Sequence, residues 1–463
     1  MDNIDKKIKE QFKKNQSFAI FFSISFFWLL LWLLAFWPGI MSLDSFVSWQ
    51  QSSTGHYSNW HPYVYGIYFF ILRQIYDSPA IIALFQIILF SLLTAWAFSK
   101  FVNLTFKRKR IIVYSVYFFL IFSVPVSLYA ITLWKDIVFS YLIIFWGLFF
   151  YLKILSKKQI DSYLLVSSLS LVLVFSATVR HNGIIFILFM PLLAYLSGIM
   201  DKKKTAYFFI LSFFVVVLLK TTVPSILGVN MSKKVLDNSY KLQIISAIVS
   251  SNYYLDRSPY PIDELNKLLP LKNMKQDYRC QTLDFALADK ELNPQAFNEP
   301  EFQKRFDAIF YSLAINNIPN VAADRMCIFT SMLTGQGIAS QNLLEKDVNF
   351  SLFPDKLGLK ADSKFPVMKY YLAKAILQSL FIPYSLFFWN MILSFSLFFF
   401  ALIHSFRRNK AIFYYSIIIM LQVPFLFLTV TANDFRYYYF VYLGSFFLIP
   451  MILSGKKIIS QNR

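Results

Sequence analysis

The chain has 463 residues, of which 57% are hydrophobic and 15% are charged, and its formal net charge is +20. So much apolar surface cannot be buried inside a water-soluble globule, which excludes a soluble enzyme and predicts an all-α polytopic membrane protein. A charge of this size would also suit a nucleic-acid-binding protein. The basic residues, however, are spread over alternate gaps between apolar runs, so the sequence predicts no nucleic-acid partner.

Ten apolar runs are long enough to cross roughly 30 Å of hydrocarbon as helices. The first run follows a basic stretch, as a signal peptide does, but it is long and no small-residue cleavage site follows it. We therefore expect it to remain as an uncleaved anchor. In chain order the runs cover residues 18–37, 79–101, 111–128, 137–154, 161–178, 183–200, 205–223, 376–403, 411–430 and 437–455.

Lysine and arginine mark every second gap between these runs and are scarce in the others. Because basic loops stay on the cytoplasmic side, both termini and these gaps are predicted to be cytoplasmic. Contact of these loops with anionic membrane lipids is compatible with the pattern, but orientation alone explains it. The abundance of Phe, Ile and Lys is typical of AT-rich bacterial genomes, so we expect a bacterial plasma membrane. The basic stretches lie at residues 6–14, 107–110, 157–158, 202–204, 407–410 and 456–457.

The first outward gap, residues 38–78, contains a carboxylate beside the membrane. Asp44 lies in the stretch WPGIMSLDSFVSWQQSSTGHYSNWHPYVYG, which is rich in aromatic residues and directly follows the first apolar run. A charge near hydrocarbon is costly unless a partner or water meets it. Asp44 is therefore a functional candidate, the alternative being an ordinary exposed loop residue.

Three other short outward gaps each carry charged residues, in the sequences LYAITLWKDIVF, ATVRHNGIIF and TANDFRYYYF. Short loops hold their side chains near the bilayer surface, so these groups are expected to converge on one site beside Asp44. The alternative is that they anchor helix ends at the interface, with residues 437–439 as an aromatic belt. The candidates are Lys135, Asp136, Arg180, His181, Asn182, Asp434 and Arg436.

Residues 224–366 differ from the rest of the chain because acidic and basic residues are equal in number there. We expect this segment to be an extracytoplasmic domain that is large enough for a core of its own. Apolar residues at helical spacing predict that the domain is mainly helical. The expected helices lie near residues 241–254, 300–317 and 319–333.

This segment divides the chain into an N-terminal membrane module, residues 1–223, and a C-terminal one, residues 367–463. Residues 366–382 are predicted to form an amphipathic helix that lies along the membrane surface. Both cysteines, Cys280 and Cys327, occur in the 224–366 segment. The compartment permits a disulfide, but two cysteines in a large domain need not be neighbours, so the sequence leaves the pairing open.

No segment has the spacing of a phosphate-binding loop such as G-x-x-x-x-G-K-[ST] or G-x-G-x-x-G, and only 12 residues are glycine. No cytoplasmic gap is long enough for a nucleotide-binding domain. Because nucleotide-activated substrates stay in the cytoplasm, an enzyme whose site faces outward is expected to use a lipid-linked substrate. The sequence also lacks C-x-x-C and H-E-x-x-H spacings, so it indicates no metal cage.

The stretch around Asp44, together with TLWKDI, RHNG and DFRYYYF, resembles the GT-C superfamily of polytopic membrane glycosyltransferases. More narrowly, these motifs are similar to a branch that is frequent in Gram-positive bacteria, and the resemblance in topology covers most of the chain. It implies transfer of one sugar from a polyprenyl-phosphate donor to an extracytoplasmic acceptor, with inversion at the anomeric carbon. The implied acceptor is a cell-wall polysaccharide, a teichoic acid or a similar glycopolymer.

The resemblance also implies that Asp44 is the catalytic general base, because it matches the acidic residue of the family's first outer loop. A carboxylate suits this role, since an acceptor hydroxyl is a poor nucleophile until its proton is accepted. The phosphate leaving group calls for fixed cations, and Lys135, Arg180 and Arg436 are the available ones.

Other residues of the same loops are expected to contact the donor phosphate or the substrate. His181 and Asn182 belong to the RHNG motif and are assigned to substrate binding. Some relatives use a divalent metal ion, for which Asp136 or Asp434 would supply a second carboxylate. The sequence leaves this requirement open.

His61 is expected either to hydrogen-bond the donor phosphate or to orient Asp44. The alternative is that it caps the helix that begins at Tyr63. Aromatic residues of the same loop are candidates for stacking on a sugar ring, and embedding in the interface is as compatible with their type. These aromatic candidates are Trp49, Tyr57 and Trp60.

Two other functions share part of this pattern. A transporter or lipid flippase would have a similar number of spans, but inverted repeats and Gly/Pro-broken helices at the bilayer midplane are not visible in the sequence. A polysaccharide polymerase or ligase that acts on lipid-linked oligosaccharides would share the outward carboxylate and basic residues. Transfer of a single sugar from a purified donor would separate the glycosyltransferase from this second alternative.

Overall fold

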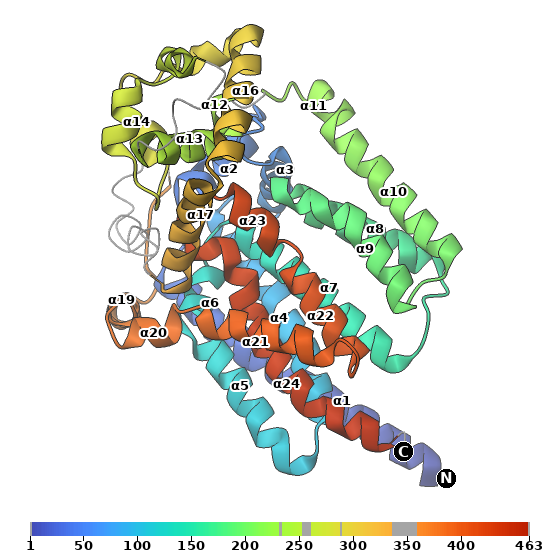
Figure 1. Cartoon of the computed structure of the whole chain (residues 1–463). Helices are drawn as coiled ribbons and strands as arrows, with labels where there is room; N and C mark the ends of the chain where they lie inside the picture. The colour runs from blue at the N-terminus through green and yellow to red at the C-terminus, as the bar shows by residue number, and fades with distance from the viewer. Residues whose placement is uncertain (1, 231–233, 252–260, 288, 336–358, 462–463) are drawn as a thin grey trace.

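Helices make up most of the described part of the chain (Figure 1). The computed structural model describes residues 2–230, 234–251, 261–287, 289–335 and 359–461. Within these ranges there is no β-strand, only three isolated β-bridges. The prediction of an all-α fold is therefore confirmed for the described part of the chain.

Seven helices in these ranges are long and apolar enough to span a membrane. A further helix pair meets the same criteria together but bends by 55° between its two parts. The chain is thus a multi-pass membrane protein with seven or eight candidate spans. The spans involve α1 (Asp2–Ala35), α4 (Pro79–Leu104), the bent pair α5 (Arg110–Phe122) and α6 (Val124–Ala130), α7 (Lys135–Ser156), α10 (Lys202–Lys220) with α11 (Thr222–Ile226), α20 (Tyr384–Phe388) with α21 (Ile392–Ser405), α22 (Lys410–Met420) with α23 (Val423–Thr429), and η8 (Phe435–Tyr438) with α24 (Tyr439–Gln461).

Two of the ten predicted spans form shorter helices. The run at 161–178 becomes α8 (Tyr163–Thr178), with 16 residues. The run at 183–200 becomes η2 (His181–Ile184) and α9 (Ile185–Ser197), with 13 residues in α9. A full crossing takes about 20 helical residues. The structure therefore supports seven or eight spans in the described ranges and does not establish ten, because α8 and α9, on either side of the polar RHNG sequence, are each shorter than a full crossing.

The helices α4 and α7 form the centre of the bundle. α4 packs against α1, and α7 packs against α4, α22 and α24. α7 and α22 approach closely at Gly147, where a Cβ atom would lie 2.8 Å from Cδ2 of Tyr415. α10 stands at the side of the bundle (Figure 1) and packs against α8 and α9. It exposes large apolar side chains such as Ile210 and Phe214. Such an exposed apolar face is typical of a helix that contacts lipid.

Two short helices, α2 (Leu43–Thr54) and α3 (Tyr63–Arg73), fill the predicted first outward gap and pack against each other. α19 (Pro366–Ser379) occupies the predicted interfacial helix and packs against α1 and α6. Its side chains Tyr370 and Tyr371 are exposed. The helix itself is confirmed, and its position along a membrane surface stays a prediction.

A second hydrophobic core, separate from the core of the bundle, lies between residues 234 and 321. Its buried residues include Ile245 and Phe306. It is formed by α12 (Lys234–Asp237), α13 (Ser239–Ser251), η4 (Ile262–Lys267), α14 (Leu271–Asp277), α15 (Asp284–Leu287), η5 (Pro294–Asn298), α16 (Pro300–Asn316) and the start of α17 (Ile318–Leu333).

The helix α17 connects the two cores. Val321 packs against the second core, whereas Ile328 and Met332 belong to the core of the bundle. The three helices predicted for this segment are present as α13, α16 and α17, with residues 252–254 outside the described residues.

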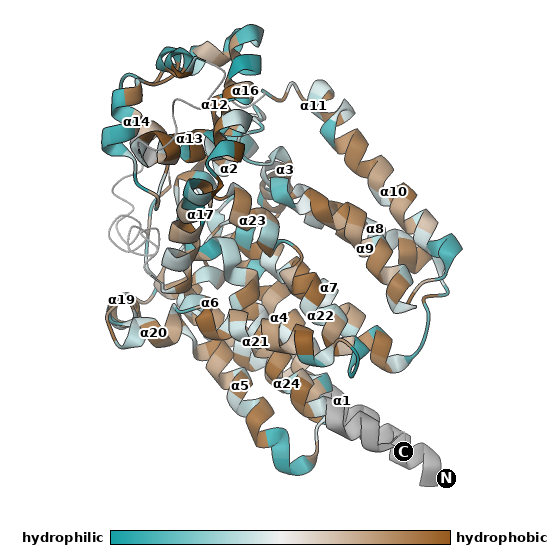
Figure 2. Ribbon diagram, viewed as in Figure 1, coloured by the Kyte–Doolittle hydropathy of each residue, from teal (hydrophilic) through white to brown (hydrophobic). Residues whose placement is uncertain are grey.

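Polar and apolar surfaces are separated along the molecule. Figure 2 shows apolar residues along the bundle helices and many polar residues on α12–α16. Both chain ends lie at the end of the bundle opposite to α12–α16, and the basic turn η1 (Lys107–Lys109) lies toward the same end (Figure 1). This arrangement agrees with the predicted separation of basic loops from the 224–366 segment.

Candidate functional site

Backbone hydrogen bonds join the first predicted outward loop to the segment that precedes α7. The N–H of Ile40 donates to the carbonyl of Ile131 (2.9 Å), and the N–H of Leu133 donates to the carbonyl of Ile40 (2.9 Å). The Oγ of Ser45 donates to the carbonyl of Leu133 (2.7 Å). These bonds place Asp44, in the first turn of α2, beside the first turn of α7.

The TANDFRYYYF loop turns sharply from α23 into η8. The carboxylate of Asp434 caps η8 by accepting a hydrogen bond from the N–H of Arg436 (3.0 Å), and it also lies 2.7 Å from Nε of Arg436. Such a bond to the backbone two residues on fixes a turn locally. The Arg436 guanidinium is held in this turn and reaches Asp44 on α2.

The RHNG loop brings a third segment to the same place. At Gly183 a Cβ atom would lie 2.5 Å from the carbonyl oxygen of Ser176, so only glycine lets η2 fold back this closely over α8. Arg180 precedes this turn in an extended conformation. Its Nε lies 3.1 Å from Oδ1 of Asp136, at the start of α7.

Three side chains from three segments surround the carboxylate of Asp44. The Nη1 of Arg436 donates to Oδ2 at 3.0 Å, and the Nζ of Lys135 lies 3.6 Å from the same oxygen. The Nε2 of His61 lies 3.6 Å from Oδ1. The Asp44 side chain keeps 27% of its surface exposed, so the carboxylate remains accessible to a ligand.

Asp136 links the two arginines. Its side chain is only 2% exposed, and its Oδ2 lies 4.0 Å from Nε of Arg436 while its Oδ1 contacts Arg180. The predicted convergence of the charged loops on Asp44 is therefore present in the structure. We refer to the resulting group as the Asp44 cluster, which consists of Asp44, His61, Lys135, Asp136, Arg180, Asp434 and Arg436.

The carboxyl groups of the Asp44 cluster have different acidities. Burial alone would raise the pKa of Asp44, but the positive charges of Arg436 and Lys135 outweigh it and hold the pKa well below its ordinary value. At Asp434 burial dominates and raises the pKa, despite the opposing effect of Arg436. Asp44 is thus ionised over the whole physiological pH range, and its resting basicity is low.

His61 is neutral in this environment. Burial and the neighbouring charge of Lys135 lower the pKa of His61 to about 3. The Nζ of Lys135 lies 3.0 Å from Nδ1 of His61. Because an ammonium group can only donate, Nδ1 is the acceptor, and the proton of the neutral ring is on Nε2, on the side of Asp44. No side chain in the described part of the chain caps the start of α3, and the Nε2 of His61 faces Asp44 at 3.6 Å, beyond hydrogen-bonding distance. The role of His61 in orienting Asp44 or in contacting the donor phosphate stays a prediction.

Two aromatic residues that the sequence did not single out for the site contact the arginines of the cluster. The guanidinium of Arg436 lies 4.6 Å from the ring centroid of Trp134, whose indole N–H donates to Oγ of Ser42 (2.6 Å). The ring of Tyr437 lies 5.4 Å from the guanidinium groups of both Arg436 and Arg180. Both aromatic residues directly adjoin a charged motif residue in sequence, and that adjacency was the available signal.

His181 and Asn182 lie beside the Asp44 cluster without joining it. The Nε2 of His181 lies 3.4 Å from the carbonyl oxygen of Trp60, and His181 lines a cavity of about 100 Å³ together with Lys220. Among the described residues, Asn182 makes no hydrogen bond to the cluster. The RHNG motif therefore contributes only Arg180 to the cluster.

The three aromatic candidates differ in accessibility. Trp60 is 47% exposed and stacks on the ring of His61, with the centroids 5.5 Å apart. Trp49 is buried, with the guanidinium of Arg73 4.1 Å from its ring centroid. Tyr57 is also buried, against α3. Only Trp60 therefore presents a ring that is open to a sugar, and the structure gives Trp49 and Tyr57 packing roles.

Within the described ranges, no group of three or more His, Cys, Asp or Glu side chains has the arrangement of a metal site. Asp136 and Asp434, the predicted second carboxylates for a metal ion, each pair with an arginine. The requirement for a divalent metal ion stays a prediction.

An apolar groove of about 350 Å³ begins one turn into α7 from the Asp44 cluster. Residues from α4, α7 and α8 line it, and they are almost entirely hydrocarbon in character. The lining residues are Leu89, Leu92, Leu93, Trp96, Val138, Tyr141, Leu142, Phe145 and Val172.

Comparisons of the chain with protein families, with curated proteins and with solved structures found no match.

Proposed function

We propose that this chain is a glycosyltransferase of the GT-C type. It transfers a single sugar from a polyprenyl-phosphate donor to a hydroxyl group of an extracytoplasmic glycopolymer. The observation that carries the proposal is the partly exposed carboxylate of Asp44, in contact with Arg436, Lys135 and a neutral His61 within an apolar helix bundle. This arrangement combines a base with cations that suit a phosphate, and transfer from a lipid phosphate needs both.

In the proposed reaction, Asp44 accepts the proton of the acceptor hydroxyl while the acceptor oxygen bonds to the anomeric carbon. The bond between that carbon and the phosphate oxygen breaks, and polyprenyl phosphate leaves with one additional negative charge. Attack from the face opposite the phosphate inverts the anomeric configuration. Negative charge thus moves from Asp44 to the phosphate, and Arg436 and Lys135 stabilise the charge as it moves.

In the absence of donor, Arg436 and Lys135 contact Asp44 and lower its pKa, so Asp44 can act as a base only when these contacts weaken. A donor phosphate competes with Asp44 for Arg436 and Lys135, so the basicity of Asp44 rises when the donor binds. The Nη1 of Arg180 is buried and has no hydrogen-bond partner in the described part of the chain, which makes it a further donor for the phosphate. Asp44 would therefore be activated as the donor occupies the site.

The apolar groove supports a lipid-linked donor. It starts at Val138, three residues after Lys135 on the same helix, and continues along α7 to Phe145. A polyprenyl chain in this groove would bring its phosphate to the end at which the Asp44 cluster lies. A water-soluble nucleotide sugar would gain nothing from such a surface.

We also propose that the Asp44 cluster and the 224–366 segment face the outside of a bacterial plasma membrane, with both termini in the cytoplasm. The separation of the basic loops from this segment supports that orientation. A membrane-impermeant thiol reagent tests it on a chain in which Cys280 and Cys327 are serine and one engineered cysteine replaces exposed Lys290. Labelling in intact cells is the expected result, and labelling only after lysis would contradict the orientation.

Transfer by the purified full-length protein tests the proposed activity. We expect radiolabel to pass from a polyprenyl phosphate that carries one labelled hexose to a glycopolymer of the host cell wall, with one sugar added per acceptor site. A panel of hexoses identifies the sugar. Elongation only from lipid-linked oligosaccharides would favour a polymerase or ligase, and movement of the labelled lipid across vesicles without any transfer would favour a flippase.

A further inference from the structure

The loop that carries Asp434 and Arg436 is held from one side by a buried arginine of α17. The Nη1 of Arg325 donates to the carbonyl oxygens of Val430 (2.7 Å) and Leu428 (3.2 Å). These carbonyls lie at the C-terminal end of α23, where helix carbonyls lack partners within the helix. Arg325 therefore fixes the point at which the chain leaves α23 for Arg436.

A second segment holds the same loop three residues further along. The N–H of Asn433 donates to the carbonyl of Gln281 (2.9 Å), and Ala432 forms an antiparallel bridge with Thr282. Asn433 directly precedes Asp434, the residue that caps η8. The loop is thus fixed both where it begins and where it enters the Asp44 cluster.

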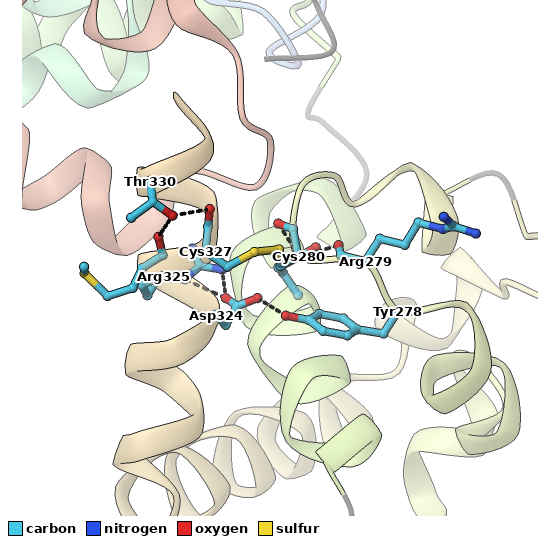
Figure 3. Close-up of a disulfide and its surroundings, with 9 residues drawn as sticks. Tyr278, Arg279, Cys280, Asp324, Arg325, Cys327 and Thr330 are labelled. Atoms are coloured by element: carbon cyan, nitrogen blue, oxygen red, sulfur yellow. Dashed lines mark hydrogen bonds and ion pairs between the residues drawn. A yellow bond between two sulfur atoms is a disulfide. The ribbon is translucent and has the colours of Figure 1, made fainter. Parts of the chain in front are cut away.

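The disulfide between Cys280 and Cys327 connects the two holding segments. Gln281 directly follows Cys280, and Arg325 lies two residues before Cys327 on α17. Figure 3 shows the disulfide running between these two segments, with Arg325 on the helix and Arg279 on the facing loop. The bond therefore sets the distance between the two groups of contacts that hold the loop.

Arg325 is itself fixed on its other side. Its side chain is 1% exposed and forms an ion pair with Asp324, whose Oδ1 accepts a hydrogen bond from the hydroxyl of Tyr278 (Figure 3). The planar guanidinium bonds the carboxylate and two carbonyls together, which the single ammonium of a lysine does not reproduce. An uninterrupted series of hydrogen bonds therefore runs from the hydroxyl of Tyr278 through the side chains of Asp324 and Arg325 to the carbonyl of Val430.

We propose that the Cys280–Cys327 disulfide and Arg325 form a clamp that positions Arg436 for its contact with Asp44. Arg325 is a positioning residue, since it contacts the loop and not the carboxylate of Asp44. The clamp itself concerns only the structure of residues 428–436. Its expected effect on donor binding rests on the proposed function. Reduction of the disulfide is then expected to loosen the loop and weaken the Arg436–Asp44 contact.

Hydrogen–deuterium exchange of the purified full-length protein tests the clamp without any substrate. After reduction we expect the backbone amides of residues 430–436 to exchange at least about tenfold faster, whereas those of residues 131–135, which contact the other side of the site, keep their rate. In a double Cys280→Ser, Cys327→Ser variant these amides are expected to exchange as fast as in the reduced protein, and the reductant is expected to leave their rate unchanged. Unchanged exchange in residues 430–436 would overturn the proposal.

Arginine variants separate the clamp from general stability. Arg325→Lys is expected to accelerate exchange in residues 430–436, while Arg305→Lys, which alters an exposed ion pair in the same segment, is not. If the proposed function is also correct, reduction and Arg325→Lys each weaken binding of a polyprenyl-phosphate hexose about tenfold, as loss of one charge-assisted hydrogen bond does. Faster exchange, with no donor binding by the oxidised, reduced or variant protein, would contradict the proposed function and still support the clamp. Faster exchange with unchanged donor affinity would contradict the role of the clamp in positioning Arg436.

Discussion

The Asp44 cluster and the Asp324–Arg325 pair are both built from carboxylates and guanidinium groups, but they differ in how completely their hydrogen-bonding groups are used. Arg325 is 1% exposed and bonds Asp324 together with two backbone carbonyls. Asp44 keeps 27% of its surface exposed, and the buried Nη1 of Arg180 has no hydrogen-bond partner within the described ranges.

This difference separates a structural role from a binding role. A buried pair whose groups all have partners holds its surroundings in one arrangement, and breaking it leaves an uncompensated charge. A cluster with an accessible carboxylate and an unused donor keeps the capacity to bind a ligand, and its groups exchange partners when the ligand arrives. The two groups are therefore expected to respond differently to substitution.

The largest effect on turnover is expected from Asp44→Asn. Asparagine has nearly the same shape and still forms hydrogen bonds, but it does not accept a proton at this site. We expect turnover to fall by about 10² to 10⁴, the usual contribution of a positioned base. Asp77→Asn is the matched control, because Asp77 is an exposed carboxylate paired with Arg73. Transfer by Asp44→Asn at the rate of this control would show that the base lies elsewhere.

The largest effect on stability is expected from a substitution in the Asp324–Arg325 pair. Arg325→Met leaves the buried carboxylate of Asp324 unpaired and should destabilise the protein by about 3–5 kcal/mol, as breaking a buried pair does. Lys135→Met should cost much less, because its carboxylate partner Asp44 is partly exposed, can be hydrated and keeps its contact with Arg436. Thermal unfolding in detergent measures both variants. Equal losses of stability would remove the distinction between the two groups.

Donor affinity is expected to depend on the arginines of the Asp44 cluster. Arg436→Ala and Arg180→Ala should each weaken donor binding by about 1.5–3 kcal/mol, the range for charge-assisted hydrogen bonds. Lysine at either position should restore only part of the affinity, since it lacks the guanidinium fork. Arg305→Ala serves as a control outside the cluster. Unchanged donor affinity in both cluster variants would reassign these arginines to anchoring the helix ends.

The smallest expected effect is the pH dependence of the wild-type protein. The pKa of Asp44 lies below its ordinary value and that of His61 is about 3, so neither group changes charge between pH 5 and pH 8. We expect no acid limb from these two residues in kcat/KM over that range. In Lys135→Met the pKa of Asp44 should rise, because one cation is lost, and the acid limb should move to higher pH. An acid limb at the same pH in both proteins would contradict this account of Asp44.

The sequence predicts the charged residues of the site better than their surroundings. Asp44, Arg180 and Arg436 are predictable because charges next to apolar runs are costly and therefore few. The contacts of Trp134 and Tyr437 with the arginines depend on how three distant loops fold against one another. From the sequence, Tyr437 is expected only as part of an aromatic belt, and Trp134 has no assigned role. Adjacency to a charged residue in sequence marks both residues as neighbours of the charged groups, but it does not encode these contacts.

The fold shows the same limit. Helical periodicity predicts α13, α16 and α17, but it does not predict that Arg325 on α17 reaches the carbonyls of Leu428 and Val430, more than 100 residues away. The cysteine pairing was open for the same reason. Hydropathy likewise marks the runs at 161–178 and 183–200 as spans, although the polar RHNG turn between them leaves two short helices.

A structure of the protein with a bound polyprenyl-phosphate sugar tests the central claim most directly. We predict that the phosphate oxygens lie within hydrogen-bonding distance of Arg436 and Arg180, that the prenyl chain follows the groove along α7, and that the anomeric carbon faces Asp44. In this complex the contact between Arg436 and Asp44 should be longer than the 3.0 Å of the free protein. A phosphate bound away from both arginines, with the Asp44 cluster unchanged, would contradict the account.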